Sequence, residues 1–515
     1  MAPYNFEQSR KDREGRSYGI VTNAPTRQVK WAMGRNVRFI PGAVAKNMGK
    51  SLLATTPSSA PIRNMFTFKG YDGVYRTLVC CDNKIYAYSA DFATRTDITP
   101  TPAPSMGSNA VWVFTLIGGM PIISNGGYDQ RWMWVDFSVP MTTVTNAPHI
   151  IRAMITDQNR LLVGNILDTT YDYPSQVKWS EDNAPTSWAM DQTQKADLES
   201  LVNPKGRMDA REVVKAFGFH EKRIGIWTER NIWFSDPIDS PAQHSIDIWH
   251  PDVGLISPRL IVTVLGHNYF MDWKDIYDLG PEGLVSLGFD LRNFIFPNLN
   301  QSALANNFAF YRPWTREVYF CIATGSNTSP DTAIVFNTEL KNLSICDVDY
   351  NAHNYSWLQS TTSWDTLPYG PWDAATDSDW NDISKTGVIP YEVVGNASGQ
   401  MLKMDSTFNN NGAAIEAYIE TGDFGEADSR LFMYRFVPHF KLIASKQPVM
   451  IQVGKREELS QDIKWSIPYP VTMGVDHAAY FKETGRYNRF RIFTDQLDSP
   501  FILEGFQAEM MQVRG

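Results

Sequence analysis

The chain has 515 residues, of which 43% are hydrophobic, 13% aromatic and 20% charged. This composition is typical of folded globular proteins and excludes a disordered chain, while the length favours one large domain joined to a smaller one. The formal net charge of -9 argues against a surface that grips nucleic-acid phosphates over its whole area.

Cysteine usage and the first residues bear on the compartment. Cys80, Cys81, Cys321 and Cys346 include no pair with metal-ligand spacing, so we expect a reduced, cytosolic site of assembly. Cys80 and Cys81 are adjacent in an apolar run and should point to opposite faces of a strand. The first residues lack the charged start and apolar core of a signal peptide, and no apolar stretch approaches about 18 residues. We expect neither that secretory route nor a membrane span.

Short runs rich in β-branched and aromatic residues recur between clusters of Gly, Pro, Asn and Asp, and long segments with helical period are hard to find. In chain order the expected strands include residues 84–88, 111–114, 132–135, 161–163, 224–228, 231–235, 269–273 and 318–320. Residues 224–228 and 231–235 predict a hairpin because only Glu229-Arg230 separates them. The sequence therefore predicts an all-β fold.

A loosely repeated phrase indicates how these strands are organised. A turn followed by a strand that ends in an aromatic residue beside Ser or Asp recurs, with variations, at residues 82–86, 127–132, 229–236, 266–270 and 399–405. Degenerate units of this kind are typical of propeller blades, so residues 51–360 are predicted to form an irregular β-propeller. Blade centres are expected around Tyr86, Trp134, Val163, Trp233, Phe270 and Tyr319. The uneven spacing leaves the number of blades open.

Four tryptophans are candidate structural anchors of the blades: Trp179, Trp188, Trp227 and Trp233. Residues 180–188 resemble the Asp-box turn of sialidase-type propellers, with Ala184 in place of the expected glycine. Such turns are folding devices, and Asp182 is expected to cap its own turn through Asx hydrogen bonds. We therefore predict packing roles for this segment and no catalytic one.

The regions that flank the predicted propeller differ from it in composition and in the pattern of apolar residues. Residues 1–50 are expected to form an N-terminal arm and the first strands. Residues 361–412 begin with an insertion rich in Trp and Asp, which carries Trp364, Trp372 and Trp380, and then return to the propeller. Residues 413–515 show clean alternation of apolar and polar residues and predict a separate antiparallel β-sandwich-like domain.

Sequence motifs for cofactor binding and catalysis are incomplete or absent. Residues 377–382 begin like a calcium loop, but Asp382 replaces the glycine of the sharp turn and Val388 stands where a bidentate Glu is needed. The eight histidines have no metal-binding spacing, and neither a P-loop nor a G-x-S-x-G elbow is present. The expectation is a protein without catalytic residues, cofactor or metal.

Four segments resemble a known family, the packaged-DNA stabilisation, hub or nozzle proteins of short-tailed phages. Residues 31–42 are similar to its opening phrase, residues 159–165 and 176–188 to its most distinctive blade, residues 225–233 to the next hairpin, and residues 485–506 to its closing strands. The resemblance implies a virion protein assembled in the host cytoplasm as a hexameric ring of the tail tube. That ring would lie below the portal and its adaptor and would carry distal needle, spike or fibre proteins.

Three functions from different classes stay open at this point. The first is a tail-tube ring that retains packaged DNA and conducts it during ejection without binding it specifically. The second is a receptor- or glycan-binding propeller, and the third is a propeller glycosidase, which would need two facing carboxylates in a pocket. For the tube, DNA should slide past channel-facing loops that present mainly Asp, Glu and small polar residues. Candidate contacts to neighbouring subunits are Arg10, Lys11, Arg13, Arg16, Trp364, Trp372 and Trp380.

Overall fold

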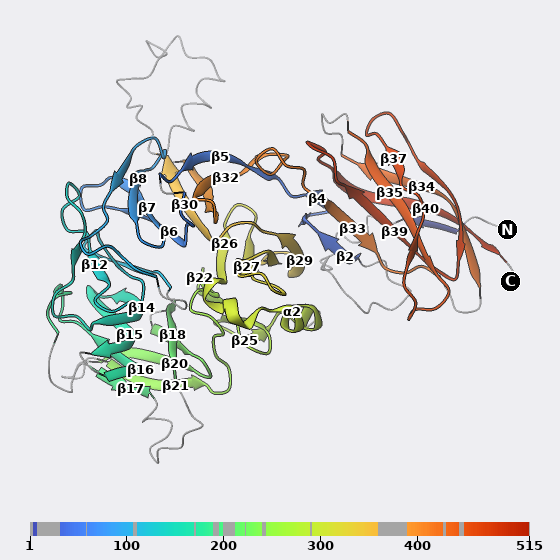
Figure 1. Cartoon of the computed structure of the whole chain (residues 1–515). Coiled ribbons are helices and arrows are strands. Elements are labelled where there is room, and N and C mark those ends of the chain that lie inside the picture. Colours follow the sequence, from blue (N-terminus) through green and yellow to red (C-terminus); the bar gives the residue numbers. More distant parts are fainter. Residues whose placement is uncertain are drawn as a thin grey trace, which may run out of the picture.

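The computed structural model describes residues 4–7, 31–57, 59–106, 111–168, 171–188, 195–198, 212–221, 223–238, 244–288, 291–358, 389–425, 429–441 and 447–513. Strands dominate, and they form a disc of radially arranged small sheets beside a second, elongated sheet domain (Figure 1). The predicted class, an all-β irregular propeller with a C-terminal antiparallel β-sandwich-like domain, is confirmed. Within these ranges no helix is long and apolar enough to cross a bilayer.

Seven four-stranded antiparallel blades can be followed around the disc in the described part of the chain, and blades 1 to 6 are meanders of consecutive strands. Blade 1 holds β6 (Asn64–Lys69), β7 (Tyr75–Cys80), β8 (Ile85–Ser89) and β9 (Arg95–Asp97). Blade 2 holds β10 (Val113–Ile117), β11 (Met120–Ser124), β12 (Arg131–Met133) and β13 (Thr142–Thr143). Blade 3 holds β14 (Ile150–Asp157), β15 (Arg160–Asp168), β16 (Tyr171–Trp179) and β17 (Lys195–Asp197).

The remaining blades follow the same plan. Blade 4 holds β18 (Val214–His220), β19 (Arg223–Thr228), β20 (Ile232–Pro237) and β21 (His244–His250), and blade 5 holds β22 (Ile261–Val264), β23 (His267–Met271), β24 (Ile276–Gly280) and β25 (Gly283–Ser286). Blade 6 holds β26 (Phe308–Arg312), β27 (Glu317–Ile322), β28 (Thr332–Asn337) and β29 (Asn342–Asp347). Between blades 5 and 6 the chain forms α2 (Arg292–Asn298) and a 3-10 turn, η4 (Gln301–Asn306). The first strand of each of these blades is the innermost, since successive first strands from β10 to β26 contact one another.

Blade 7 is assembled from both ends of the chain. Its inner strands are β30 (Ala352–Leu358), β31 (Ile389–Gly395) and β32 (Gln400–Thr407), and its outer strand is β5 (Gly49–Thr55), which pairs antiparallel with β32. β30 in turn contacts β6 of blade 1, so the disc is closed. Each predicted blade centre belongs to a different blade, from Tyr86 in blade 1 to Tyr319 in blade 6. The predicted hairpin is present as β19 and β20, with Trp227 opposite Ile232.

The second domain is a sandwich of two sheets. One sheet has the order β3 (Val37–Ile40), β4 (Ala43–Lys46), β40 (Ile502–Val513), β34 (Arg430–Phe440) and β38 (Ala479–Gly485), with β1 (Tyr4–Glu7) also paired to β40. The other has the order β2 (Trp31–Arg35), β33 (Ala417–Thr421), β39 (Tyr487–Thr494) and β35 (Val449–Arg456), and β35 also pairs with β36 (Lys464–Trp465) and β37 (Tyr469–Val471).

The sandwich is not built from C-terminal residues alone. β2, β3 and β4 lie in its two sheets, so the first strands expected within residues 1–50 belong to the domain predicted from residues 413–515. The apolar residues of these strands explain this placement, because Trp31, Val37 and Phe39 complete a core shared with strands from the C-terminal hundred residues. β2 also pairs in parallel with β29 of blade 6 through Arg35 and Ile345, which joins the two domains in one ten-stranded sheet.

Apolar clusters fill the spaces between neighbouring blades. A blade in the disc buries both of its faces, so its strands read as nearly continuous apolar runs, and every residue of β27 and β28 is buried. Cys80 packs in the cluster between blades 1 and 2, whereas Cys81 packs in the cluster between blades 7 and 1. The two thiols therefore point to opposite faces, as predicted, and burial raises the pKa of Cys81 to about 12.

The four candidate anchors occupy these interblade clusters to different degrees. Trp179 and Trp233, each 2% exposed, lie in the cluster between blades 3 and 4. Trp227 is fully buried in the cluster that lies between blades 4 and 5 and extends to blade 6. Its ring makes an edge contact with Phe270. Trp188 is only half-buried, packs against the cluster of blades 2 and 3, and donates from Nε1 to the Pro185 carbonyl oxygen at 2.8 Å.

This difference in burial predicts unequal costs of truncation. Trp179→Ala should lower the free energy of unfolding by about 3–5 kcal/mol, because it leaves an enclosed cavity between two blades. Trp188→Ala should cost clearly less, since the space it vacates opens to solvent. Urea unfolding of both variants measures the difference. An unchanged midpoint for Trp179→Ala, or equal costs at the two positions, would contradict these packing roles.

Candidate functional site

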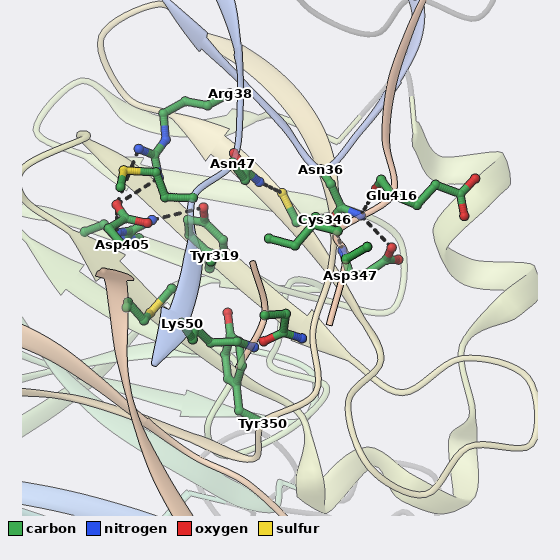
Figure 2. Close-up of a pocket in the computed structure, with 17 residues that line it drawn as sticks. Asn36, Arg38, Asn47, Lys50, Tyr319, Cys346, Asp347, Tyr350, Asp405 and Glu416 are labelled. Atoms are coloured by element: carbon green, nitrogen blue, oxygen red, sulfur yellow. Dashed lines mark hydrogen bonds and ion pairs between the residues drawn. The ribbon is translucent and has the colours of Figure 1, made fainter. Parts of the chain in front are cut away.

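A hollow of about 270 Å³ lies where the sandwich meets the propeller. Its walls come from β3 and the start of β5, from blades 6 and 7, and from the segment that leads from blade 7 into the sandwich. Figure 2 shows polar side chains from all of these segments converging on it. The site therefore lies between elements from both ends of the chain.

One wall is an interdomain ion cluster, made of Arg38, Arg312, Glu317, Glu392 and Asp405. Arg312 Nε lies 2.6 Å from Glu392 Oε2, and its NH2 atom lies 2.6 Å from Asp405 Oδ2. Arg38 reaches the same Asp405 oxygen at 3.4 Å and Glu317 Oε2 at 3.2 Å. Because Arg38 comes from the sandwich and the others from blades 6 and 7, the cluster binds three parts of the molecule together.

The cluster is largely shielded from water. The side chains of Arg312, Glu317 and Glu392 are each 3% exposed. Burial raises the pKa of Glu392 above its ordinary value although Arg312 opposes the shift. Burial also holds the pKa of His353 well below its ordinary value, so the imidazole that stacks on Phe310 at 3.8 Å is neutral near pH 7. Two buried cations thus face three carboxylates in a region of low dielectric constant.

A second polar group closes the opposite side of the hollow. Lys50 of β5 pairs with Asp349, and its ammonium lies 4.8 Å from the centre of the Tyr350 ring. Burial lowers the pKa of Lys50, whereas the adjacent Lys50 lowers the pKa of Asp349 against the effect of burial. Asn410 donates to the other Asp349 oxygen at 3.0 Å, which fixes the segment after blade 7 to the segment between blades 6 and 7.

Asn36 connects the turn between β2 and β3 to two further segments. Its Nδ2 donates to Asp347 Oδ2 at 2.6 Å and to the Glu416 carbonyl oxygen at 2.7 Å, and its Oδ1 accepts from the Asp347 amide at 2.7 Å (Figure 2). Its φ of 56° lies in the left-handed region, which asparagine tolerates better than most residues. A short polar side chain at this turn therefore joins the sandwich to blade 6 and to the segment that leads from blade 7 into the sandwich.

The chemistry of the hollow is that of a rigid joint. Its acidic side chains include Asp405, which two arginines engage, and Asp347, which Arg35 contacts at 2.5 Å. The Cys346 thiol accepts from Asn47 Nδ2 at 2.9 Å, and burial raises its pKa to about 12, so it stays protonated near pH 7. These groups are held in pairs that orient the domains.

A second hollow, of about 510 Å³, opens at one mouth of the propeller channel. Residues from blades 2, 3 and 4, from the segment before β22 and from η4 line it, including Arg152 and Lys215. Arg152 bonds to Asn165 Oδ1 and to Asp172 Oδ1, each at 2.8 Å. Two cations, Arg152 and Lys215, and the side-chain amides of Asn165 and Gln301 thus line this hollow.

Arg259, next to this mouth, extends across the centre of the disc. From the segment before β22 its guanidinium donates to the carbonyl oxygens of Arg63 and Asn351, each at 3.0 Å, and lies 4.9 Å from the Phe308 ring. It therefore links the segment before blade 5 to the first strand of blade 6 and to the segments that lead into blades 1 and 7. Burial lowers the pKa of Arg259 to about 10, which still leaves the group charged near pH 7.

The other predicted site residues fall into two groups: those outside the described residues and those whose contacts the structure shows. Arg10, Lys11, Arg13, Arg16, Trp364, Trp372 and Trp380 lie outside the described residues, as do residues 377–382. In the Asp-box-like turn, Ser180 holds the backbone: its Oγ accepts from the Leu161 amide and donates to the Glu181 carbonyl oxygen, each at 3.0 Å, while Asp182 is exposed. Across the described chain, no three His, Cys, Asp or Glu side chains group as metal ligands.

Sequence reasoning missed the interdomain ion cluster and Arg259. The sequence did contain one signal. Arg312 ends one strand and Glu317 begins the next, and both strands are otherwise apolar or aromatic. Charged residues of this kind are rarely buried without a partner. Their partners could not be chosen from the sequence, since Arg38 and Asp405 lie at opposite ends of the chain.

No family model matches the sequence, and no curated protein matches it. Among solved structures, the extracellular domain of a protein described as a one-component system of B. thetaiotaomicron aligns at 7% identity and a TM-score of 0.41, covering 93% of this chain and 62% of that chain. The Pan2 WD40 domain of Neurospora crassa aligns at 9% identity and a TM-score of 0.39, covering 70% and 94%. PorZ of Porphyromonas gingivalis aligns at 8% identity and 0.34, covering 73% and 43%. Scores this low carry no inference about function.

Removing the central cation of the interdomain ion cluster should be costly and pH-dependent. Arg312→Met leaves Glu392 without its guanidinium and Asp405 with Arg38 alone, so we expect the free energy of unfolding near pH 7 to fall by about 3–5 kcal/mol. The pKa of Glu392 is already raised in the folded state, and losing Arg312 raises it further. A raised folded-state pKa favours folding below the unfolded value and loses that benefit as pH rises, so the variant should lose least in acid.

Urea unfolding between about pH 5 and about pH 8 measures this dependence. Arg316→Met is the matched control, because Arg316 and Glu339 form an ion pair at 3.1 Å with side chains 59% and 52% exposed. Its cost should stay below about 1 kcal/mol. A loss in Arg312→Met that did not change with pH would contradict the assignment.

Proposed function

We propose that this protein is a structural subunit of a phage virion, forming a ring of the tail tube through which DNA leaves the capsid. The proposal rests on the four sequence segments that resemble hub or nozzle proteins, combined with a propeller firmly joined to a sandwich. A tube wall needs rigid subunits whose domains keep a fixed angle, and buried ion pairs across the joint serve that need. The interdomain ion cluster is the observation that supports this reading most directly.

The propeller axis constrains where DNA would pass. Arg259 bonds across the centre of the disc, so a duplex could not thread through a single propeller. In the proposed ring DNA therefore passes through a lumen bounded by several copies, with the portal and adaptor above and needle, spike or fibre proteins below. The subunit would assemble in the host cytoplasm and act in the virion.

A receptor- or glycan-binding propeller is the second candidate. The hollow at the channel mouth favours it, since about 510 Å³ with Arg152 and Lys215 in its wall is within the usual size range of ligand sites. The glycosidase candidate has less support, because Asp405 and Asp347 in the junction hollow are each engaged by arginine. A binding propeller can act as a single copy, whereas a tube ring cannot.

Native mass spectrometry tests the proposal. At micromolar concentration the purified chain should give a complex of several 58.4 kDa copies, six for the expected hexamer, and negative-stain images should show rings with a central opening. The control is the same protein in mild denaturant, which should give the single-copy mass. A protein that stays monomeric at high concentration and binds a defined glycan would contradict the ring and favour the second candidate.

The proposed passive lumen makes a separate prediction about DNA. With a formal net charge of -9, the protein should bind duplex DNA no better than non-specifically at physiological salt, because rapid passage requires weak contacts. Fluorescence anisotropy with a labelled duplex over a salt series measures this. A submicromolar, steeply salt-dependent affinity would contradict passive sliding, while leaving the ring itself in place.

A further inference from the structure

The outer strands of the blades differ in how far they are protected. In the described residues β9, β13, β17 and β25 have only two to four residues each, and β29 pairs with β2 through Arg35 and Ile345. Among the described strands of the propeller, only β5 and β21 are outer strands of seven residues. Folded proteins usually keep open edges short, covered or charged, since a long edge pairs with another chain.

β21 has one exposed charged residue, Asp247, and an irregular register against β20 at Ile232 and Trp233, but within the described residues it is neither short nor covered. Its sequence contains no Lys, Arg or Pro, and in the described chain it is the last strand of its sheet. Ile248, near its C-terminal end, is 44% exposed. Trp249 stacks on Phe234 of β20 with ring centres 3.8 Å apart, which holds the strand against its blade. The strand therefore presents a rigid edge with an exposed aliphatic side chain.

β5 offers a matching edge. The backbone of Lys50 is already bonded to Asn409 and Asn411, which covers the beginning of the strand. Residues 51–55 extend beyond this contact, and Leu52 among them is 50% exposed. β5 and β21 lie on opposite sides of the disc, so one copy could use both edges at the same time (Figure 1).

We propose that β21 of one copy pairs with β5 of the next, and that this strand pairing is the contact between neighbouring subunits. The inference rests on the proposed ring. A ring needs two different surfaces on each copy, which these edges supply. In the antiparallel register that places Ile248 opposite Leu52, residues 245–249 face residues 51–55, and the two exposed aliphatic side chains cover each other.

Lysine substitutions at the two edges provide the first test. Ile248→Lys and Leu52→Lys should each raise the concentration needed for assembly by at least about tenfold, because an edge lysine opposes strand pairing. Thr96→Lys, on the exposed three-residue strand β9, is the matched control and should assemble like the wild type. Circular dichroism confirms that each variant is folded.

Mixing the two variants sharpens the test. Ile248→Lys retains an intact β5 edge and Leu52→Lys retains an intact β21 edge, so an equimolar mixture should form dimers that neither variant forms alone. If the wild type forms rings and both variants do so at the same concentration, the strand contact is overturned and the ring stands. If the wild type stays monomeric at high concentration, the ring fails and the strand contact fails with it.

Disulfide trapping checks the contact even if a lysine variant fails to fold. A chain carrying both Ile248→Cys and Leu52→Cys should give a ladder of covalent oligomers on mild oxidation, because directly opposed residues have Cα separations that suit a disulfide. The four natural cysteines are buried and should not contribute. The pair Thr96→Cys and Leu52→Cys should remain monomeric in denaturing gels. Absence of the ladder in assembled Ile248→Cys/Leu52→Cys protein would overturn the proposed contact.

Discussion

The pairing of β5 with β32 closes the propeller, and the order of the whole chain depends on it. A disc of blades needs its last blade to meet its first, and here the outer strand of blade 7 comes from residues that precede blade 1. The strands that precede β5 in the chain, β2, β3 and β4, belong to the sandwich. The chain thus starts in the sandwich and adds the outer strand of blade 7. It then runs through the blades of the propeller in order and returns to complete the sandwich.

This route explains why ionic groups gather at the junction. Both crossings between the domains pass the same place, so Lys50 at the end of the first crossing meets Asp349, and Arg38 of the sandwich meets Asp405 of blade 7. Burying charges costs desolvation energy, and apolar residues would hold the surfaces together at least as well. What paired charges add is geometry, because an arginine that serves two carboxylates tolerates little rotation between the parts that carry them. A fixed angle between propeller and sandwich is the expected consequence.

A fixed angle and a bonded axis make sense in a protein that works as a building block. Arg259 ties together four blades at the centre of the disc, and the Asn36 turn ties the sandwich to blade 6. Neither feature prepares a group for reaction; both restrict motion. The proposed role in a tail tube uses this restriction, because a wall that guides DNA has to keep its lumen constant while the duplex moves past.

The sequence by itself determined the class of the fold and the location of most blades. Short runs rich in β-branched and aromatic residues are local signals, and six of the seven described blades contain a strand that could be found in this way. Pairing between distant segments leaves no local signal. The membership of β2 to β4 in the sandwich, the closing role of β5, the partners of Arg312 and the reach of Arg259 all depend on which segments meet, and only the tertiary structure decided them. The same reason applies to Trp188, which reads in sequence like Trp179 but is only half-buried, since burial depends on the neighbours that the fold supplies.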